Sequence, residues 1–183
     1  MRRYLDMSFK VISGGQTGAD IGGVLAARLH GIKTGGWMPY GWETLNGPRP
    51  EYAELFNMVE HRDPGYKPRT WENVYDSDGT IRLAKDFCSA GERYTLNGIK
   101  KYDKPYIDVE IKEPIIYPED VKHVAEWIVR CDIRVLNVAG NSHRTWAGMQ
   151  TYTTRFLSYV FFQMGYARGT LTQDYKQLAR LGW

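Results

Sequence analysis

The chain has 183 residues, of which 43% are hydrophobic and 25% are charged, a composition typical of one soluble globular domain. A net charge of +3 is too small to argue for a nucleic-acid partner, and no apolar run reaches the length of a membrane span. The two cysteines, Cys88 and Cys131, lie far apart and form no zinc-binding or disulfide pattern, so we expect no metal site. Cysteine usage and the lack of an apolar signal-peptide core predict a cytoplasmic protein without a membrane partner.

A glycine-rich turn separates the first expected strand, over residues 9–13, from the first expected helix, over residues 19–30. A strand, a glycine turn and a helix N-terminus in this order form a natural anion site, because the backbone can approach a ligand and the first helical turn presents N–H groups. We therefore expect a phosphate here, or else a tight turn in which the glycines serve only packing. The candidate ligand-binding residues are Gly14, Gly15, Gln16, Thr17, Gly18 and Asp20.

A short second strand over residues 32–34 completes a strand–helix–strand unit and predicts a parallel sheet. Periodicity then fails over residues 35–77, so we expect a long loop there, with one or two helical turns over 51–59 and a role as a binding loop or lid. Trp37 follows the second strand at the edge where open α/β folds bind ligands. Its ring could stack on a base, or it could cap the loop against the core.

Two acidic residues, Asp76 and Asp78, precede a third strand expected over residues 80–83. Their carboxylates could bind ribose hydroxyls, hold a metal ion through water, or act as an acid or base. They could equally form Asx-turns that fix the loop.

The second half of the chain continues the alternation of strands and helices. Strands are expected over residues 105–109 and 133–138, and helices from residue 118 and over 147–164. Asn137 interrupts the apolar strand, so it faces either the ligand crevice or neighbouring loops that supply hydrogen-bond partners. Ser142 and Arg144 follow this strand and could hydrogen-bond a phosphate, although Arg144 could also be a solvated loop charge. A helical extension over residues 166–183 carries an apolar stripe that favours a homo-oligomer.

Four stretches resemble the molybdenum carrier family of the SLOG superfamily, whose Rossmann-like nucleotide-binding members include the Lonely Guy phosphoribohydrolases. The stretches are, in chain order, Ser13–Asp20; Thr34–Trp37 with Pro39; Arg69–Asn73 together with Asp76–Thr80; and Val135–Gly140. They span about residues 10–160. The resemblance implies a nucleotide-binding α/β fold and adds Gly36 to the candidate site.

One turn departs from the pattern of this family. Where the family carries Gly-Gly-Thr as a second phosphate contact, this chain keeps only Gly91 and has Glu92 in place of the threonine. A carboxylate at a helix N-terminus would repel a phosphate, or it could face a ribose or act as a base. The glycine-rich catalytic motif of the Lonely Guy enzymes is absent from this region, which argues against hydrolysis.

The sequence thus predicts a single α/β domain over residues 1–183, with a Rossmann-like parallel sheet of about five main strands flanked by helices and a core over about 9–164. The first hypothesis is a carrier, sensor or sequestering protein for a phosphate-bearing, nucleotide-like small molecule. The resemblance implies molybdenum cofactor, or an ADP-ribose-type or cyclic nucleotide signal, as candidate ligands. The alternative is a nucleotide N-glycoside hydrolase that uses the carboxylate of Asp78 or Glu92.

Overall fold

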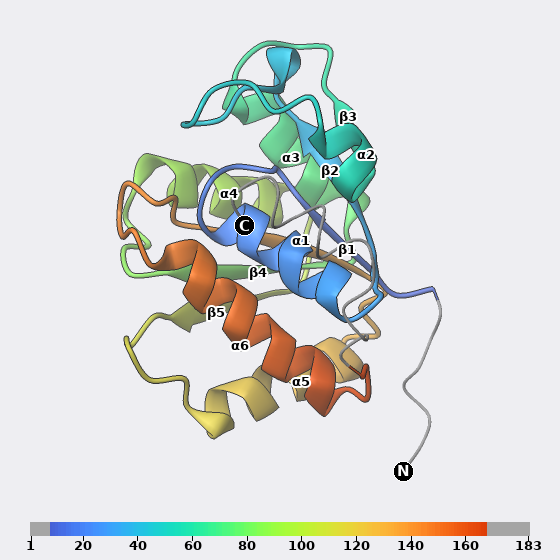
Figure 1. The fold of residues 1–183 in the computed structure, drawn as a ribbon, viewed down its shortest axis with the longest axis vertical. Coiled ribbons are helices and arrows are strands. Elements are labelled where there is room, and N and C mark those ends of the chain that lie inside the picture. Colours follow the sequence, from blue (N-terminus) through green and yellow to red (C-terminus); the bar gives the residue numbers. More distant parts are fainter. Residues whose placement is uncertain (1–7, 168–183) are drawn as a thin grey trace.

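The structure is a computed structural model that describes residues 8–167 (Figure 1). Within this range, strands and helices alternate in an α/β arrangement, with one short 3₁₀ helix, η1 (Tyr40–Trp42). The strands are β1 (Lys10–Ser13), β2 (Lys33–Met38), β3 (Met58–Glu60), β4 (Gly79–Ala84), β5 (Tyr106–Glu110) and β6 (Val135–Gly140). The helices are α1 (Ala19–Leu29), α2 (Tyr52–Phe56), α3 (Tyr66–Asp76), α4 (Ala90–Lys101), α5 (Pro118–Arg130) and α6 (Met149–Gln163).

The strands form one parallel sheet in the order β3-β2-β1-β6-β4-β5. Ser13 of β1 lies beside Val138 of β6, and Val138 lies beside Ile81 of β4. Because these three central strands are parallel and in register, their carboxyl ends meet at one edge of the sheet. This confirms the predicted Rossmann-like α/β fold.

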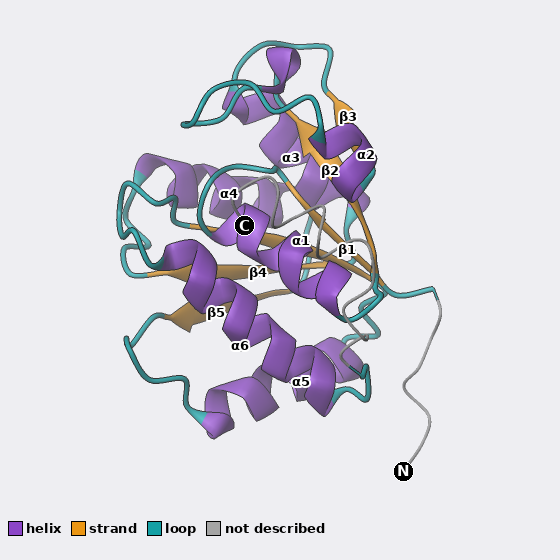
Figure 2. Cartoon of the chain, in the orientation of Figure 1, coloured by secondary structure: helices purple, strands orange, loops and turns teal. Residues whose placement is uncertain are grey.

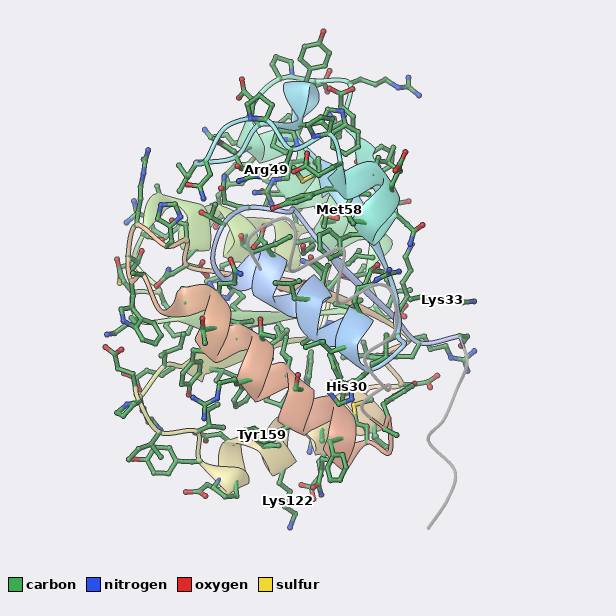
Figure 3. The ribbon with its side chains drawn as sticks, in the orientation of Figure 1. His30, Lys33, Arg49, Met58, Lys122 and Tyr159 are labelled. Atoms are coloured by element: carbon green, nitrogen blue, oxygen red, sulfur yellow. The ribbon has the colours of Figure 1, made fainter. Side chains whose placement is uncertain are left out.

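Helices cover both faces of the sheet (Figure 2). The chain moves in one direction along the sheet through α1, α2 and α5, and in the other direction through α3 and α4. Right-handed crossovers therefore place these two groups on opposite faces. The helix contacts agree, because α6 packs against both α1 and α5, whereas α3 packs against α4. The outer sides of α5 and α6 carry groups such as Lys122 and Tyr159, which point away from the sheet (Figure 3).

The segment expected as a long loop after the second strand differs most from the prediction. It holds the end of β2, the edge strand β3 and the 11-residue helix α3, so the sheet has six strands instead of about five. The face that α3 buries consists of Arg69, Asn73 and Val74. A mostly polar buried face gives no apolar stripe for a helical periodicity to detect. Pro68 lies in the first turn of this helix, where proline is tolerated.

The central strands form the middle of the core. β4 is buried at every position, and the side chains of Val11, Leu136 and Val138 are fully buried beside it. No helix within residues 8–167 is both long and apolar enough to cross a membrane. The expected C-terminal extension falls, from residue 168 onward, outside the residues that the structure describes.

Candidate functional site

A cleft of about 550 Å³ opens at the edge where β1, β4 and β6 end. On either side of the junction between β1 and β6, the chain winds away in opposite directions. Open α/β sheets bind ligands at such a switch point, because the loops that follow the two strands diverge there. The polar groups that line the cleft are Gln16, Asp20, Tyr66, Arg69, Thr70, Asn73, Ser89, Glu92, Thr95, Asn137, Asn141, Ser142, Arg144 and Thr145.

Most N–H groups of the glycine turn between β1 and α1 already have hydrogen-bond partners within the chain. Gly15 N donates to Ser13 Oγ (3.2 Å), and Gln16 N donates to Asp20 Oδ2 (3.3 Å). Thr17 N donates to Gln16 Oε1 (2.9 Å), an oxygen that also accepts from Leu45 N. The turn is therefore held in part by its own side chains, and the choice between a phosphate site and a packing turn stays a prediction.

Gly18 closes this turn at the N-cap of α1 with a φ of 96°. A β carbon there would lie 2.5 Å from the carbonyl oxygen of Asn141. Glycine is required at this position both for the positive φ and for the close approach of the loop after β6. Gly15, Thr17 and Gly18 do not line the cleft, whereas Gly14, Gln16 and Asp20 do.

Asp20 and Arg69 form a buried ion pair on one side of the cleft, with 3.3 Å between Arg69 Nη1 and Asp20 Oδ2. Burial raises the pKa of Asp20, and the positive charge of Arg69 opposes that rise. Arg69 Nε is buried and has no hydrogen-bond partner in the described part of the chain. The cleft is therefore lined by a guanidinium group that retains an unused donor.

Glu92 lies across the cleft from this pair, in the first turn of α4, and only 2% of its surface is exposed. Its Oε2 is 3.7 Å from Arg82 Nη1 and has no hydrogen-bond partner among residues 8–167. Arg82 donates both Nε (2.8 Å) and Nη2 (2.5 Å) to the carboxylate of Asp108. The charge of Arg82 is thus largely neutralised by Asp108, which leaves Glu92 poorly compensated.

This environment raises the pKa of Glu92 to about 8. Burial is the main cause, and the charge of Arg82 opposes it. The nearby carboxylates of Asp20, Asp108 and Asp86 raise the pKa further. At pH 7 Glu92 is therefore mostly neutral, so it can donate a hydrogen bond and does not repel a phosphate as the ionised form would.

Amide side chains link the floor of the cleft to the surrounding elements. Asn73 bridges α3 to β2, because its Oδ1 accepts from Trp37 N (2.9 Å) and its Nδ2 donates to Trp37 O (3.0 Å). Asn137 Nδ2 donates to Thr80 Oγ1 on the neighbouring strand (3.1 Å), and Asn137 also lines the cleft. Asn141 joins the loop after β6 to the end of β4 by accepting from Lys85 N (2.9 Å). These groups are fixed in position and present polar edges to the cleft.

The loop after β6 forms the rim of the cleft. Ser142 and Arg144, both expected from the sequence, line it. Arg144 is exposed and has no hydrogen-bond or ion-pair partner within residues 8–167. Gly91 also lines the cleft, at the start of α4.

Trp37, Asp76 and Gly36 lie outside the cleft. Trp37 Nε1 donates to Asp76 Oδ2 (2.7 Å), and all three residues border a separate hollow of about 340 Å³. The Trp37 ring packs edge-on against His61, with 5.8 Å between ring centroids. The Trp37 ring thus contacts local side chains and lies outside the cleft.

Asp78 lies at the opposite edge of the sheet. Its Oδ2 accepts from Arg134 N (3.0 Å) and Val135 N (2.7 Å), immediately before β6 begins. A residue that precedes a parallel strand lies at the amino edge, whereas the cleft is at the carboxyl edge. Asp78 therefore holds two strand starts together and is not placed to touch a ligand in the cleft.

A family model described as the circularly permutated YpsA SLOG family matches residues 11–161. The chain belongs to this family. A crystal structure of a putative molybdenum carrier protein from Syntrophus aciditrophicus SB is similar, with a TM-score of 0.75 and 32% sequence identity over 82% of this chain and 93% of that chain. No curated protein matches the chain. The SLOG assignment and this neighbour support a ligand-binding role in general.

The residues that line the cleft but are not among the site candidates from the sequence include Arg69, Asn73, Thr95 and Asn141. Arg69 and Asn73 stood out there as part of a motif, but nothing indicated that they lie on a helix facing the glycine turn. Thr95 and Asn141 carried no signal of their own. Among residues 8–167, no three His, Cys, Asp or Glu side chains gather as metal ligands.

Proposed function

We propose that the cleft binds a phosphate-bearing, nucleotide-like small molecule, for which the protein acts as a carrier, sensor or sequestering protein. The observation that carries the proposal is that two polar side chains lining the cleft each have a buried atom without a hydrogen-bond partner. Arg69 Nε and Glu92 Oε2 are both buried without a hydrogen-bond partner in the described chain, and both side chains line the cleft. An unsatisfied buried polar atom costs free energy, so a ligand gains affinity if the Arg69 and Glu92 side chains turn these two closed-off atoms toward it on binding.

The chemistry of the lining suits the parts of such a molecule. Carboxyl groups and amides, such as those of Asp20, Asn73 and Asn137, can pair with sugar hydroxyls and the edge of a base. A volume of about 550 Å³ falls in the range of small-molecule sites. The name of the structural neighbour makes a molybdenum cofactor one candidate ligand. An ADP-ribose-type or cyclic nucleotide has the same combination of ring, hydroxyl and phosphate groups.

Nucleotide N-glycoside hydrolysis remains the second candidate, and it now depends on Glu92 alone, because Asp78 is at the other edge of the sheet. A buried carboxyl group with a pKa of about 8 is protonated at neutral pH. Such a group can act as a general acid that protonates a departing base.

Native mass spectrometry of the purified protein, followed by denaturing release, tests the proposal and separates the two candidates. A retained nucleotide or pterin that is recovered unchanged after incubation supports the binding protein, whereas a released free base supports hydrolysis. Arg69→Met should lose the bound molecule, and Asp78→Ala, which alters the opposite edge, should keep it. A protein that retains nothing, and shows no thermal shift with nucleotides, ADP-ribose or molybdopterin, would contradict both candidates.

A further inference from the structure

A second groove continues the cleft outward. It has a volume of about 840 Å³ and lies between the first turns of α3 and α4. The cleft and the groove share Tyr66, Thr70, Ala90 and Gly91. A β carbon at Gly91 would meet no other atom within 4 Å, so the space beside this shared residue is open. We call the two spaces the inner cleft and the outer groove.

The two spaces differ in charge. The inner cleft is lined by two acidic side chains, Asp20 and Glu92, and by two arginines, Arg69 and Arg144. The outer groove is lined by Lys67 and Arg93, and none of its lining residues is acidic. In the inner cleft Arg69 is paired with Asp20 and Glu92 is mostly neutral at pH 7, which leaves one uncompensated cation, Arg144. The outer groove has two cations and no acidic residue, so it is the more positive of the two spaces and is favoured by the anionic part of a ligand.

The two cations of the outer groove are held by different contacts, Lys67 by an aromatic wall and Arg93 by a backbone carbonyl. The Tyr94 ring stacks on Trp71, with 5.0 Å between centroids and 13° between planes. Lys67 Nζ lies over the Tyr94 ring at 5.3 Å, and Arg93 Nη1 donates to Cys88 O (2.7 Å). These contacts hold both charged groups at the groove. At the passage itself, the guanidinium of Arg69 lies 5.9 Å from the centroid of the Tyr66 ring.

We propose that the outer groove holds the phosphate end of the ligand and that the inner cleft holds its sugar and base. This inference rests on the proposed function. It assigns the phosphate contacts to Lys67 and Arg93. The glycine turn is not chosen for this role because most of its N–H groups are bonded within the chain.

Calorimetric titration with the four ribonucleosides and their 5′-monophosphates and 5′-diphosphates tests this placement. The quantity of interest is the affinity gained by adding phosphate to each nucleoside. Lys67→Gln/Arg93→Gln should reduce that gain by about tenfold or more, since charge-assisted hydrogen bonds are lost, and should leave nucleoside affinity unchanged. Lys33→Gln/Lys122→Gln is the matched control, because it removes the same charge from two lysines that point away from the protein (Figure 3). The control should keep the wild-type gain.

Two other outcomes are distinguishable. If Lys67→Gln/Arg93→Gln binds the nucleotides with the wild-type gain, the phosphate lies elsewhere; the placement is then overturned, and the proposed function stands. If the wild-type protein binds no nucleoside or nucleotide of the panel, the placement is overturned. The proposed function is overturned with it only if the protein also retains no small molecule and shows no thermal shift with ADP-ribose or molybdopterin.

Discussion

The guanidinium of Arg69 occupies the space that a side chain at Gly14 would need. A β carbon at Gly14 would lie 1.5 Å from Arg69 Nη1 and 2.1 Å from Cζ. Gly14, the first glycine after β1, therefore leaves room for the side chain of Arg69, which lies 55 positions further along the chain. This close contact allows Arg69 to reach Asp20. In this protein, the space beside the first glycine of a motif that resembles a phosphate loop is occupied by the protein's own Arg69 side chain.

Gly14→Ala should push Arg69 out of its position and break its ion pair with Asp20. We expect a loss of about 1–3 kcal/mol in the free energy of unfolding, as for other overpacked buried sites, together with weaker ligand binding. Urea denaturation gives the stability. Gly91→Ala is the matched control, because a β carbon there meets open space, and its stability should equal or exceed that of the wild type. Equal stability of Gly14→Ala and the wild type would show that Arg69 is not held as described.

Arg69→Met should make stability depend more strongly on pH. Burial already raises the pKa of Asp20, and Arg69 opposes that rise as its ion-pair partner among residues 8–167, so the pKa of Asp20 rises further in the variant. The folded state then binds a proton that the unfolded state releases near pH 4, and stability falls as pH rises through the interval between the two pKa values. Breaking a buried pair costs about 3–5 kcal/mol at a pH where the remaining group is ionised.

Denaturation of Arg69→Met at pH 5 and pH 8 measures this effect. Adding Asp20→Asn to the variant removes the titrating group, so the double variant should lose the extra pH dependence. The same pH dependence in the single and double variants would exclude Asp20 as its source.

The alternation of strands and helices could be predicted from the sequence because apolar periodicity records burial. α1, α5 and α6 lie close to their predicted positions for this reason. α3 could not be found in the same way, since it buries Arg69 and Asn73, and polar residues that are bonded inside a fold look like loop residues in sequence.

The structure places the residues predicted for the site at different edges of the sheet, and the reason is geometric. The candidates that follow a strand, such as Asp20, Ser142 and Arg144, meet at the carboxyl edge of the sheet. Asp78 precedes a strand and so lies at the amino edge. The sequence could supply that distinction, but it could not supply the contact between Arg69 and Gly14, because the two residues meet only after the strands have been ordered in the sheet.

Asp78→Ala should lower stability without affecting ligand binding. Two backbone N–H groups lose their acceptor, which should cost about 1 kcal/mol each at most. Calorimetric titration with the molecule recovered from the wild-type protein should give an unchanged dissociation constant, because the cleft lies at the other edge of the sheet. A large loss of affinity in a folded Asp78→Ala protein would contradict this prediction and would show that Asp78 contributes to ligand binding.

Glu92→Gln should stabilise the protein increasingly as pH rises from about 4.5 to about 8. The folded-state pKa of Glu92 is raised from 4.5 to about 8, mainly by burial, so over this interval the folded state keeps a proton that the unfolded state has released. The stability of the wild type therefore falls with increasing pH, and above pH 8 the penalty stays constant because both states are ionised. Glutamine has nearly the same shape and no ionisable group, so the variant avoids the penalty. Chemical denaturation from pH 4 to pH 9 should give a stability difference that is small at the acid end, grows through neutral pH and levels off. A stability difference that does not change with pH would mean that the Glu92 carboxyl group is ionised in the folded protein at neutral pH. Glu92 could then not donate a hydrogen bond to a ligand in the inner cleft.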